Sequence, residues 1–447
     1  MLFHFLQANV PVPRDIPLPL PLPEWLLITL LIVSFLLHIV FVNLMIGGTV
    51  LTLWSQIKGL KDRDYHNLAH EISRTITVNK SIAVVLGVAP LLCINTLYSI
   101  YFYSANALTG TMWISIIPLV VVAFLLTYLN KYTWNILDEN KALHIAIISL
   151  ATIIFLFIPL IFLTNVNLML FPEKWGTVKG FLSALLLPNV FPRYFHFICA
   201  SLAVTGLFLF WYMGRKSYPF EEYFTTLTRY DVKKKAYSLT LAASIAQFIF
   251  GPLVLLTLPT KGFDAKLILI ILSGAIIALP AMWWMWKAIT GKPENIDLHF
   301  GKVVVALSIT VVFMGSGRHV YRANALAPHK KLMAANTAEF ERLSKEAREN
   351  PVAEKPDLKL DSTLGVVAKG AAIFQVNCSS CHKEKEKLVG PPITEMVSIY
   401  ASDKDGLKQW IKAPGKKRPD YPQMPALTQL TDDDREELAK YILSVKN

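Results

Sequence analysis

The chain has 447 residues, of which 53% are hydrophobic and only 17% are charged, so most of it belongs in lipid rather than in water. The formal net charge of +12 could suggest a nucleic-acid partner. Many of the basic residues lie in loops between apolar segments, however, which is typical of a membrane protein, so we expect no nucleic acid. Four cysteines are too few for a disulfide framework, and Cys93 and Cys199 stand singly in apolar segments, where packing roles are expected.

Residues 1–24 are rich in proline and lack the charged start and apolar run of a secretory signal peptide, so we expect a short outer segment. Eight later stretches are long and apolar enough to cross a bilayer. Helices are expected for all of them, because lipid offers no partners for a free backbone. The predicted spans are Trp25–Gln56, Ile76–Tyr103, Trp113–Trp134, Leu143–Leu163, Phe191–Met213, Tyr237–Leu258, Leu267–Trp286 and Val303–Tyr321.

Lysine and arginine are distributed unevenly over the loops between these spans. If both chain ends lie outside, the inner loops hold more lysine and arginine than the outer loops do, which is the bias typical of cytoplasmic loops. The expected location is therefore the bacterial inner membrane, with the N-terminus and the C-terminal region on the periplasmic side. The basic residues of the outer segments, apart from arginines at the membrane edge, are Arg14, Lys174, Lys179, Lys261 and Lys266.

The predicted fold class is all-α, in two parts. Residues 25–323 are expected to form a polytopic bundle of about eight transmembrane helices. Residues 324–362 are predicted to form a charged helix, Lys330–Glu349, and then an extended linker that contains proline. Residues 363–447 are expected to form a small soluble helical domain.

The soluble domain contains the motif Cys378-Ser-Ser-Cys381-His382. Two thiols at this spacing can add to the two vinyl groups of a haem, and the adjacent His382 is placed to bind its iron. A thioredoxin-like pair or half of a zinc site would explain the cysteines but not the histidine, and there is no second cysteine pair. We therefore expect one covalent haem c, which in bacteria is attached outside the cytoplasm.

The second axial ligand of this haem is expected downstream of the motif. Met424 lies between prolines in a loop, which is a poor position for a core side chain. Met396 is the alternative, but it falls close to the Gly390-Pro391-Pro392 loop. Methionine and histidine together would raise the reduction potential.

Several short motifs occur here in the order typical of one family. Gly370-x-x-x-Phe374, Cys-x-x-Cys-His, Gly-Pro-Pro, Leu407-x-x-Trp410-Ile and Gln-Met-Pro follow one another in residues 363–447. This region resembles the class I monohaem cytochromes c. The resemblance implies a small helical fold and a role in electron transfer.

Ionisable side chains inside a membrane are costly, so each one is a functional candidate. His196 lies near the outer end of the fifth span and His319 near the outer end of the eighth, at similar depth. Two neutral imidazoles from different helices can bind one haem b iron. Hydrogen bonding to a neighbouring helix is the alternative for each histidine.

Three arginines accompany these histidines and could pair with haem propionates, namely Arg193, Arg318 and Arg322. His38 in the first span is a third candidate iron ligand, so one or two haems b are expected. His66 and His70 are four residues apart in an inner loop and could share a metal, but we expect them on a solvated helix face.

The surroundings of the membrane histidines resemble a second family. The segment from His38 to Gly48 is similar to the first-helix haem-ligand segment of the large subunit of cytochrome bd quinol oxidases. Arg193-Tyr-Phe-His196 is similar to that family's fifth-helix segment, whose histidine binds the low-spin haem b. Gly317-Arg318-His319-Val-Tyr resembles its Gly-Arg-Gln-Pro-Trp signature. The resemblance implies haem b, a second membrane subunit and a link to the quinone pool.

The chain also departs from that family. The third span contains no glutamate, Met314-Gly-Ser replaces the acid before Gly317, and the loop 259–266 is short. The outer half of the seventh span also lacks a methionine. These departures argue against oxygen reduction and against quinol oxidation at the family's usual site.

The expected function is respiratory electron transfer between haem b in the membrane and haem c on the periplasmic side. The chain would be an oxidoreductase subunit with a periplasmic redox partner, and no catalytic residue is assigned. A bd-like terminal oxidase or nitrogen-oxide reductase fed by the haem c is one alternative. A haem-free membrane anchor for the cytochrome domain is the other.

Overall fold

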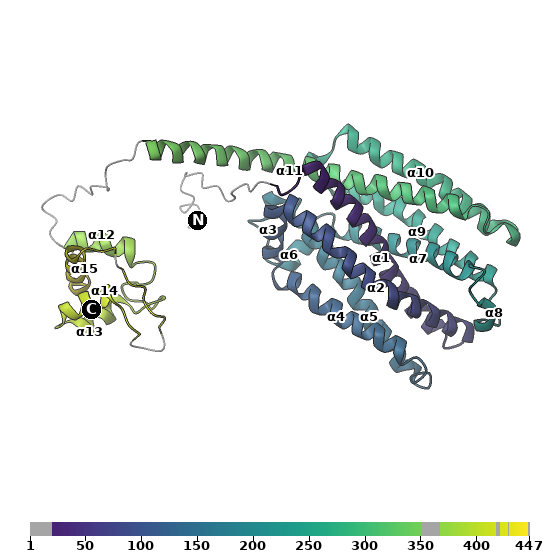
Figure 1. Cartoon of the computed structure of the whole chain (residues 1–447), viewed down its shortest axis with the longest axis horizontal. Helices are drawn as coiled ribbons and strands as arrows, with labels where there is room; N and C mark the ends of the chain where they lie inside the picture. The colour runs from purple at the N-terminus through teal and green to yellow at the C-terminus, as the bar shows by residue number, and fades with distance from the viewer. Residues whose placement is uncertain (1–19, 350–366, 417–420, 428, 446–447) are drawn as a thin grey trace. The chain divides into compact units, whose positions relative to one another are not determined.

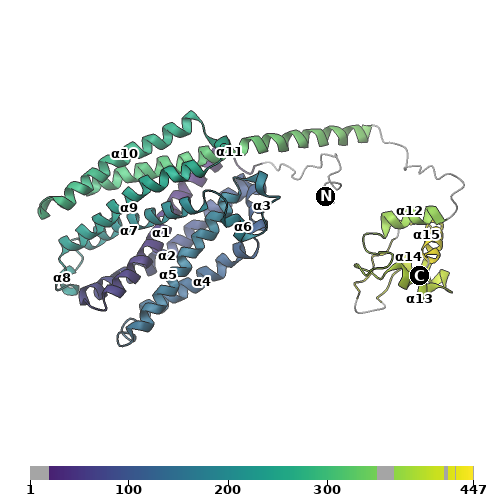
Figure 2. The ribbon, with the colours of Figure 1, turned by 180° about the vertical axis from the view of Figure 1, so that it is seen from behind.

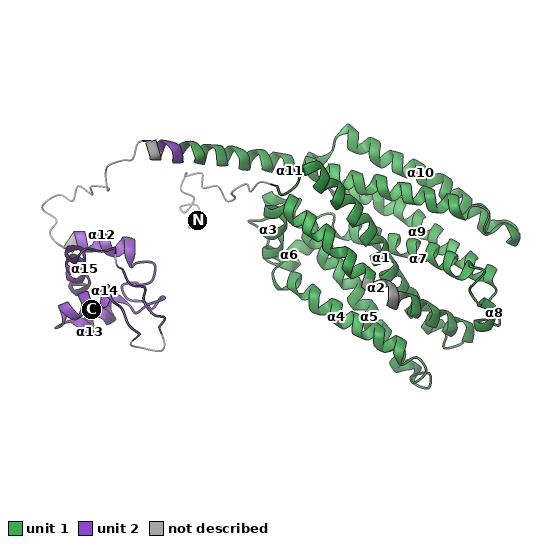
Figure 3. Ribbon diagram, viewed as in Figure 1, with its two compact units in different colours: residues 1–342 green, residues 343–447 purple. Residues whose placement is uncertain are grey.

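The computed structural model describes residues 20–349, 367–416, 421–427 and 429–445, except for the side chains of residues 76–81, 347–349 and 367–368. The described residues form helices without any strand (Figure 1). The chain divides into two compact units, residues 1–342 and 343–447 (Figure 3). The α-helices are α1 (Glu24–Lys58), α2 (Arg63–Leu97), α3 (Ser99–Thr109), α4 (Thr111–Tyr132), α5 (Lys141–Leu168), α6 (Phe181–Leu185), α7 (Val190–Gly214), α8 (Phe220–Tyr223), α9 (Arg229–Thr257), α10 (Ala265–Thr290), α11 (Phe300–Glu349), α12 (Val367–Asn377), α13 (Ile393–Tyr400), α14 (Lys404–Lys412) and α15 (Asp432–Ser444). Short 3-10 helices occupy Pro172–Lys174, Thr260–Gly262 and Pro293–Asn295.

Among the described residues, seven helices are long and apolar enough to cross a membrane: α1, α4, α5, α7, α9, α10 and α11. The predicted second span, Ile76–Tyr103, is instead two helices that meet at Tyr98 at an angle of 109°. Tyr98 leaves the helical conformation, with φ of −134° and ψ of 36°. Counting this bent pair as one span gives eight.

The eighth predicted span and the charged helix that follows it form one element. Helix α11 runs without a break for 50 residues from Phe300 to Glu349, with Pro328 inside it (Figure 1). The predicted charged helix Lys330–Glu349 is helical, and it continues the eighth predicted span without a break. The predicted linker after Glu349 lies outside the described residues.

Small and hydroxylated side chains bring α1, α7 and α9 close together. A Cβ atom on Gly47 would lie 2.3 Å from Thr205 Oγ1, and one on Gly206 would lie 2.3 Å from Thr240 Oγ1. Ser201 Oγ donates to Asn43 Oδ1 across the α1–α7 contact at 3.0 Å. Small residues let membrane helices approach closely, and buried hydroxyl and amide groups then bond across the interface. Figure 2 shows the same bundle from behind, with α4 and α5 paired at one side.

The end of the bundle where α2 begins is fixed by one carboxylate. Asp64 is 1% exposed, and its Oδ2 accepts from the backbone N–H groups of Thr225, Thr226 and Leu227 at 3.0, 2.5 and 2.7 Å. Burial raises the pKa of this carboxyl, but the hydrogen bonds outweigh burial and lower the pKa to about 2. Asp64 therefore ties the loop before α9 to the start of α2.

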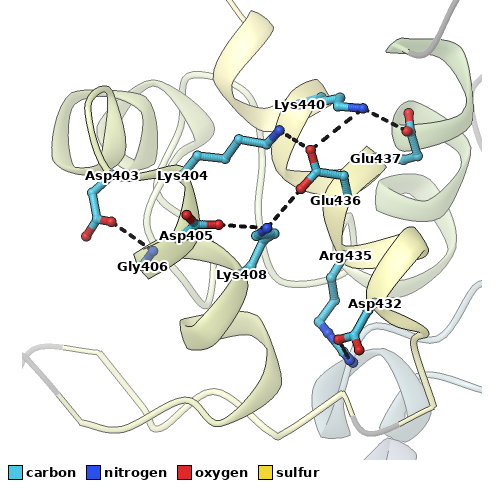
Figure 4. A network of polar contacts seen from close by, with 10 residues as sticks. All are labelled: Asp403, Lys404, Asp405, Gly406, Lys408, Asp432, Arg435, Glu436, Glu437 and Lys440. Carbon is cyan, nitrogen blue, oxygen red and sulfur yellow. Dashed lines mark hydrogen bonds and ion pairs between the residues drawn. The ribbon is translucent and has the colours of Figure 1, made fainter.

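The second unit is held by a crossing of α12 and α15. A Cβ atom on Gly370 would lie 2.1 Å from the carbonyl oxygen of Glu437, so only glycine allows this approach. Leu438 and Ala439 of α15 are fully buried beneath the crossing. Outside this core, Lys404 and Lys408 of α14 both pair with Glu436 of α15, as Figure 4 shows. Exposed ion pairs of this kind contribute modestly, so the apolar crossing carries most of the stability.

Asp64→Asn is expected to destabilise the protein by about 2 kcal/mol at pH 7, because backbone N–H groups would lose a charged acceptor. The folded-state pKa is below that of an unfolded aspartate, so this stability is present above about pH 4. It is lost as the pH falls toward 2. Thermal unfolding in detergent at pH 7 measures the difference, with Glu294→Gln, at an exposed carboxylate, as the control. Equal unfolding temperatures for wild type and Asp64→Asn would show that the carboxylate is not a clamp.

Candidate functional site

The cysteine–histidine motif begins where α12 ends. The N–H groups of Cys381 and His382 donate to the Cys378 carbonyl at 3.0 and 2.9 Å, so the backbone continues for one tight turn. The thiols of Cys378 and Cys381 and the imidazole of His382 therefore all belong to this one turn. Its local geometry therefore follows from the sequence of the motif alone.

The His382 ring is held by the loop that follows the motif. Its Nδ1 lies 2.8 Å from the Pro391 carbonyl oxygen, to which it donates in the neutral tautomer, and Nε2 remains for a metal. A Cβ atom on Gly390 would lie 2.3 Å from the imidazole, so only glycine leaves room for the ring. The Gly390 N–H in turn donates to the Cys381 carbonyl at 2.8 Å. A histidine oriented in this way by a backbone carbonyl is typical of a metal ligand.

The Cys378 thiol does not have the character of a reactive redox thiol. Cys378 is 7% exposed, and burial, together with the neighbouring Cys381, raises the pKa of its thiol to about 11. Thioredoxin-like chemistry requires a lowered thiol pKa. The surroundings of Cys378 therefore argue against that alternative.

The two downstream methionines have different surroundings. Met396 lies on α13 and packs against the core that contains Phe374 and Leu438. Met424 is half-buried in a segment without secondary structure and does not belong to that core. Met424 therefore has the surroundings expected of an iron ligand, and Met396 those of a core residue.

His196 and His319 lie at the same end of the membrane unit. His196 lies near the start of α7. Asn189, the residue just before α7, donates its side-chain amide to the Val254 carbonyl near the end of α9. His319 precedes Tyr321, whose hydroxyl donates to the Pro259 carbonyl just beyond the end of α9. This end is the one predicted to face outward.

Both of these imidazoles have a buried nitrogen without a partner. Among the described residues, Nδ1 of His196 and Nδ1 of His319 are both inaccessible to water and make no hydrogen bond. An unpaired buried polar nitrogen costs free energy, so it needs an explanation, and a bound group is one. In the described part of the chain, Nδ1 of His299 is also buried and unpaired. His38 differs, because its Nδ1 lies 2.8 Å from the Ala83 carbonyl oxygen of α2.

The three arginines form one cluster with these histidines. Arg322 is 7% exposed, and Arg193 and Arg318 are half-buried. Each of the three is within electrostatic range of at least one other. None of them forms an ion pair within the part of the chain that the structure describes. Guanidinium groups gathered in this way require an anion, and carboxylates such as haem propionates fit them.

The candidate ligands face different neighbours. His196 faces α9, where Gly251 leaves space beside its ring, and His319 is within electrostatic range of Arg322 and Glu24. His38 faces α2, since a Cβ atom on Gly87 would lie 2.9 Å from its ring. The structure thus brings His319 together with the arginines, places His196 at the same end, and turns His38 toward another helix.

The inner-loop histidines pack around a tryptophan. His66 is 5% exposed and accepts from Trp134 Nε1 at 3.0 Å, and the rings of His70 and His144 lie 4.6 Å from the Trp134 ring. Burial lowers the pKa of His66 to about 4, so the ring is neutral at pH 7. The predicted solvated face is therefore wrong for His66. No three potential ligands are grouped for a metal ion in the described part of the chain.

The cytochrome c family model matches residues 367–446. Residues 367–446 are a cytochrome c domain. The domain accounts for the order of its motifs and supports covalent haem c at Cys378 and Cys381.

No curated protein matches the chain. Among solved structures, it is similar to a chain of the bd oxidase from Geobacillus thermodenitrificans, with a TM-score of 0.51 and 13% sequence identity. The similarity covers 73% of this chain and 99% of that chain. The protein is therefore a multi-pass membrane protein with a bd-like helical fold, fused to a cytochrome c domain.

Sequence patterns missed one residue of the membrane site. Tyr98 contacts Arg322 at the break between α2 and α3, but it stands in an apolar stretch without a nearby glycine or proline. An aromatic residue is common in a predicted span, so the sequence did not indicate that Tyr98 would break the helix or contact Arg322. Only the folded structure shows this.

Met424→Ala is expected to leave haem attached to the cytochrome c domain and to lower its reduction potential, because a thioether favours ferrous iron. A redox titration of the c-band absorbance measures this change. Met396→Leu, which conserves volume in the core, is the control and should leave the potential unchanged. A wild-type potential in Met424→Ala, with an intact sulfur-to-iron absorption band, would contradict the assignment.

Proposed function

We propose that this protein transfers electrons between haem b in its membrane unit and the haem c of its cytochrome c domain. The unpartnered imidazoles of His196 and His319, at one end of the bundle with three arginines, are the observation that carries the proposal. One haem b could take both imidazoles and the arginines at once. Its iron takes neutral imidazole nitrogens, and its propionates take guanidinium groups.

The chain's own residues have separate tasks at this site. His196 and His319 would hold the iron, and Arg193, Arg318 and Arg322 would hold the propionates. A bound haem b supplies reversible one-electron chemistry. The arginines would raise its reduction potential, because positive charge beside the haem favours the reduced form.

His38 is the candidate ligand of a second haem b. Its Nδ1 donates to the Ala83 carbonyl in the neutral tautomer, which leaves Nε2 for iron, as at His382. Because His38 faces α2, this haem would be separate from the one at His196 and His319. The protein would then bind one or two haems b.

The cytochrome c domain would receive or deliver electrons at high effective concentration, because it belongs to the same chain as the membrane unit. Its haem would be held by Cys378, Cys381, His382 and Met424. We propose the bacterial inner membrane as the location, with this domain on the periplasmic side. A second membrane subunit, the quinone pool and a periplasmic redox protein are the proposed partners.

A bd-like oxidase or nitrogen-oxide reductase is the second candidate function. The observation in its favour is His38, whose ring lies against α2 and for which we assign no second iron ligand, so an iron held there would have one side open to a small ligand. Carbon monoxide bound by the reduced protein would favour this function. A membrane unit without haem would make the bundle a simple anchor.

His196→Ala and His319→Ala are each expected to remove or convert the same low-spin haem b signal, because each removes one ligand of one iron. Low-temperature absorption and electron paramagnetic resonance spectra of the purified protein measure this signal. Both variants should also stop reduction of the haem c through the membrane unit.

His144→Ala is the matched control, since His144 is a buried histidine whose Nε2 lies 2.8 Å from the Asn130 carbonyl, in the group around Trp134. It should leave both haem spectra unchanged. Two different haem b signals lost in the two variants would refute the pairing of His196 with His319. Wild-type haem b spectra in both would refute the site.

A further inference from the structure

The segment that carries Met424, residues 421–427, has little backbone support of its own. It contains no helix or strand, and no backbone group of residues 422–426 bonds the backbone of another described residue. Pro422 and Pro425 lack an N–H group and have a fixed φ, so the segment is stiff. Its position therefore depends on side-chain contacts, and a contact made at one end of so stiff a segment is felt at Met424.

Tyr421 anchors this segment at two points. Its hydroxyl donates to Oε2 of Glu395 on α13 at 3.4 Å, and Nζ of Lys387 lies 4.3 Å from the centre of its ring. The hydrogen bond is long and Lys387 is exposed, so each contact alone is modest. Hydrogen bonds and cation–π contacts both depend on orientation, so together they fix the position of the tyrosine.

Both partners of this tyrosine belong to the loop and helix that hold His382. Lys387 lies in the loop after the cysteine–histidine motif, in which the Pro391 carbonyl oxygen lies 2.8 Å from His382 Nδ1. Glu395 is in the first turn of α13 and follows Thr394, whose N–H donates to a carbonyl near the start of that loop at 3.2 Å. The segment with the proposed sulfur ligand is thereby joined to the structure that orients the histidine ligand.

We propose that Tyr421 is a positioning residue that keeps Met424 on the iron of haem c, an inference that rests on the proposed ligation by Met424. Tyr421 acts through Met424 and not on the iron. Its hydroxyl and its ring hold the segment closed, through Glu395 and Lys387 respectively. When the segment opens, one axial position of the iron is free, so the fraction of open segment sets how readily an outside ligand binds.

Another tyrosine of the same domain provides the control. Tyr441 lies on α15, and its ring centre lies 5.5 Å from that of Phe374 in the core of the domain. Tyr441→Phe removes one hydroxyl from the domain and leaves Tyr421 and its two partners unchanged. General loosening of the domain would affect both hydroxyl variants, whereas opening of the Met424 segment involves Tyr421 alone.

The experiment is a titration of ferric full-length protein with imidazole, which binds the haem c iron only where Met424 has left it. Loss of the sulfur-to-iron absorption band measures this binding. Tyr421→Phe keeps the ring under Lys387 and should tighten imidazole binding about threefold, whereas Tyr421→Leu removes both contacts and should tighten it about tenfold. Tyr441→Phe should leave it unchanged. Added to Glu395→Ala, Tyr421→Phe should have no further effect, because the hydroxyl acts through that carboxylate.

Each outcome decides one question. Wild-type protein without a sulfur-to-iron band would overturn the proposed ligation by Met424. If wild type shows the band, wild-type imidazole affinity in both Tyr421 variants would overturn the role of Tyr421 and leave the ligation standing. An equal change in Tyr441→Phe, or a further threefold change when Tyr421→Phe is added to Glu395→Ala, would likewise overturn it. The covalent haem content of each variant should equal that of wild type.

Discussion

Buried positive charge is the constraint on which the membrane unit depends. Arg193, Arg318 and Arg322 lie close together and are buried or half-buried, and none forms an ion pair among the described residues. Isolated charges in such surroundings are costly, so the cluster requires a counter-anion. The imidazoles of His196 and His319 lie at the same end, each with a buried Nδ1 that has no partner among the described residues, and imidazoles suit a metal. The proposed haem b answers both requirements with one molecule.

The haem c site and the proposed haem b site depend on different parts of the chain. In the cytochrome c domain the site depends on local chain geometry, with the Pro391 carbonyl and Gly390 shaping the position of His382. In the membrane unit it depends on helices far apart in sequence, with Gly251 beside His196 and Tyr98 beside Arg322. A change in helix packing would therefore alter the membrane site first, and the tethered domain would retain its own chemistry.

The same difference explains how much could be predicted from sequence. The motif from Cys378 to His382 is local, so spacing alone predicted its chemistry, and hydropathy predicted seven of the spans as single helices. The bend at Tyr98 was not predictable, because no glycine or proline marks it and tertiary contacts hold it. The continuous α11 was missed because polarity changes near Tyr321 while helical geometry does not. The partner of His38 could not be inferred, because it lies on another helix.

The haem content of the purified full-length protein tests the central claim most directly. Pyridine haemochrome spectra distinguish haem b from haem c in one sample, and protein concentration gives the ratio of each to the chain. The account predicts one haem c per chain together with one or two haems b. Haem c alone, in protein prepared from membranes that supply haem b, would contradict the claim and leave the bundle as an anchor for the cytochrome c domain.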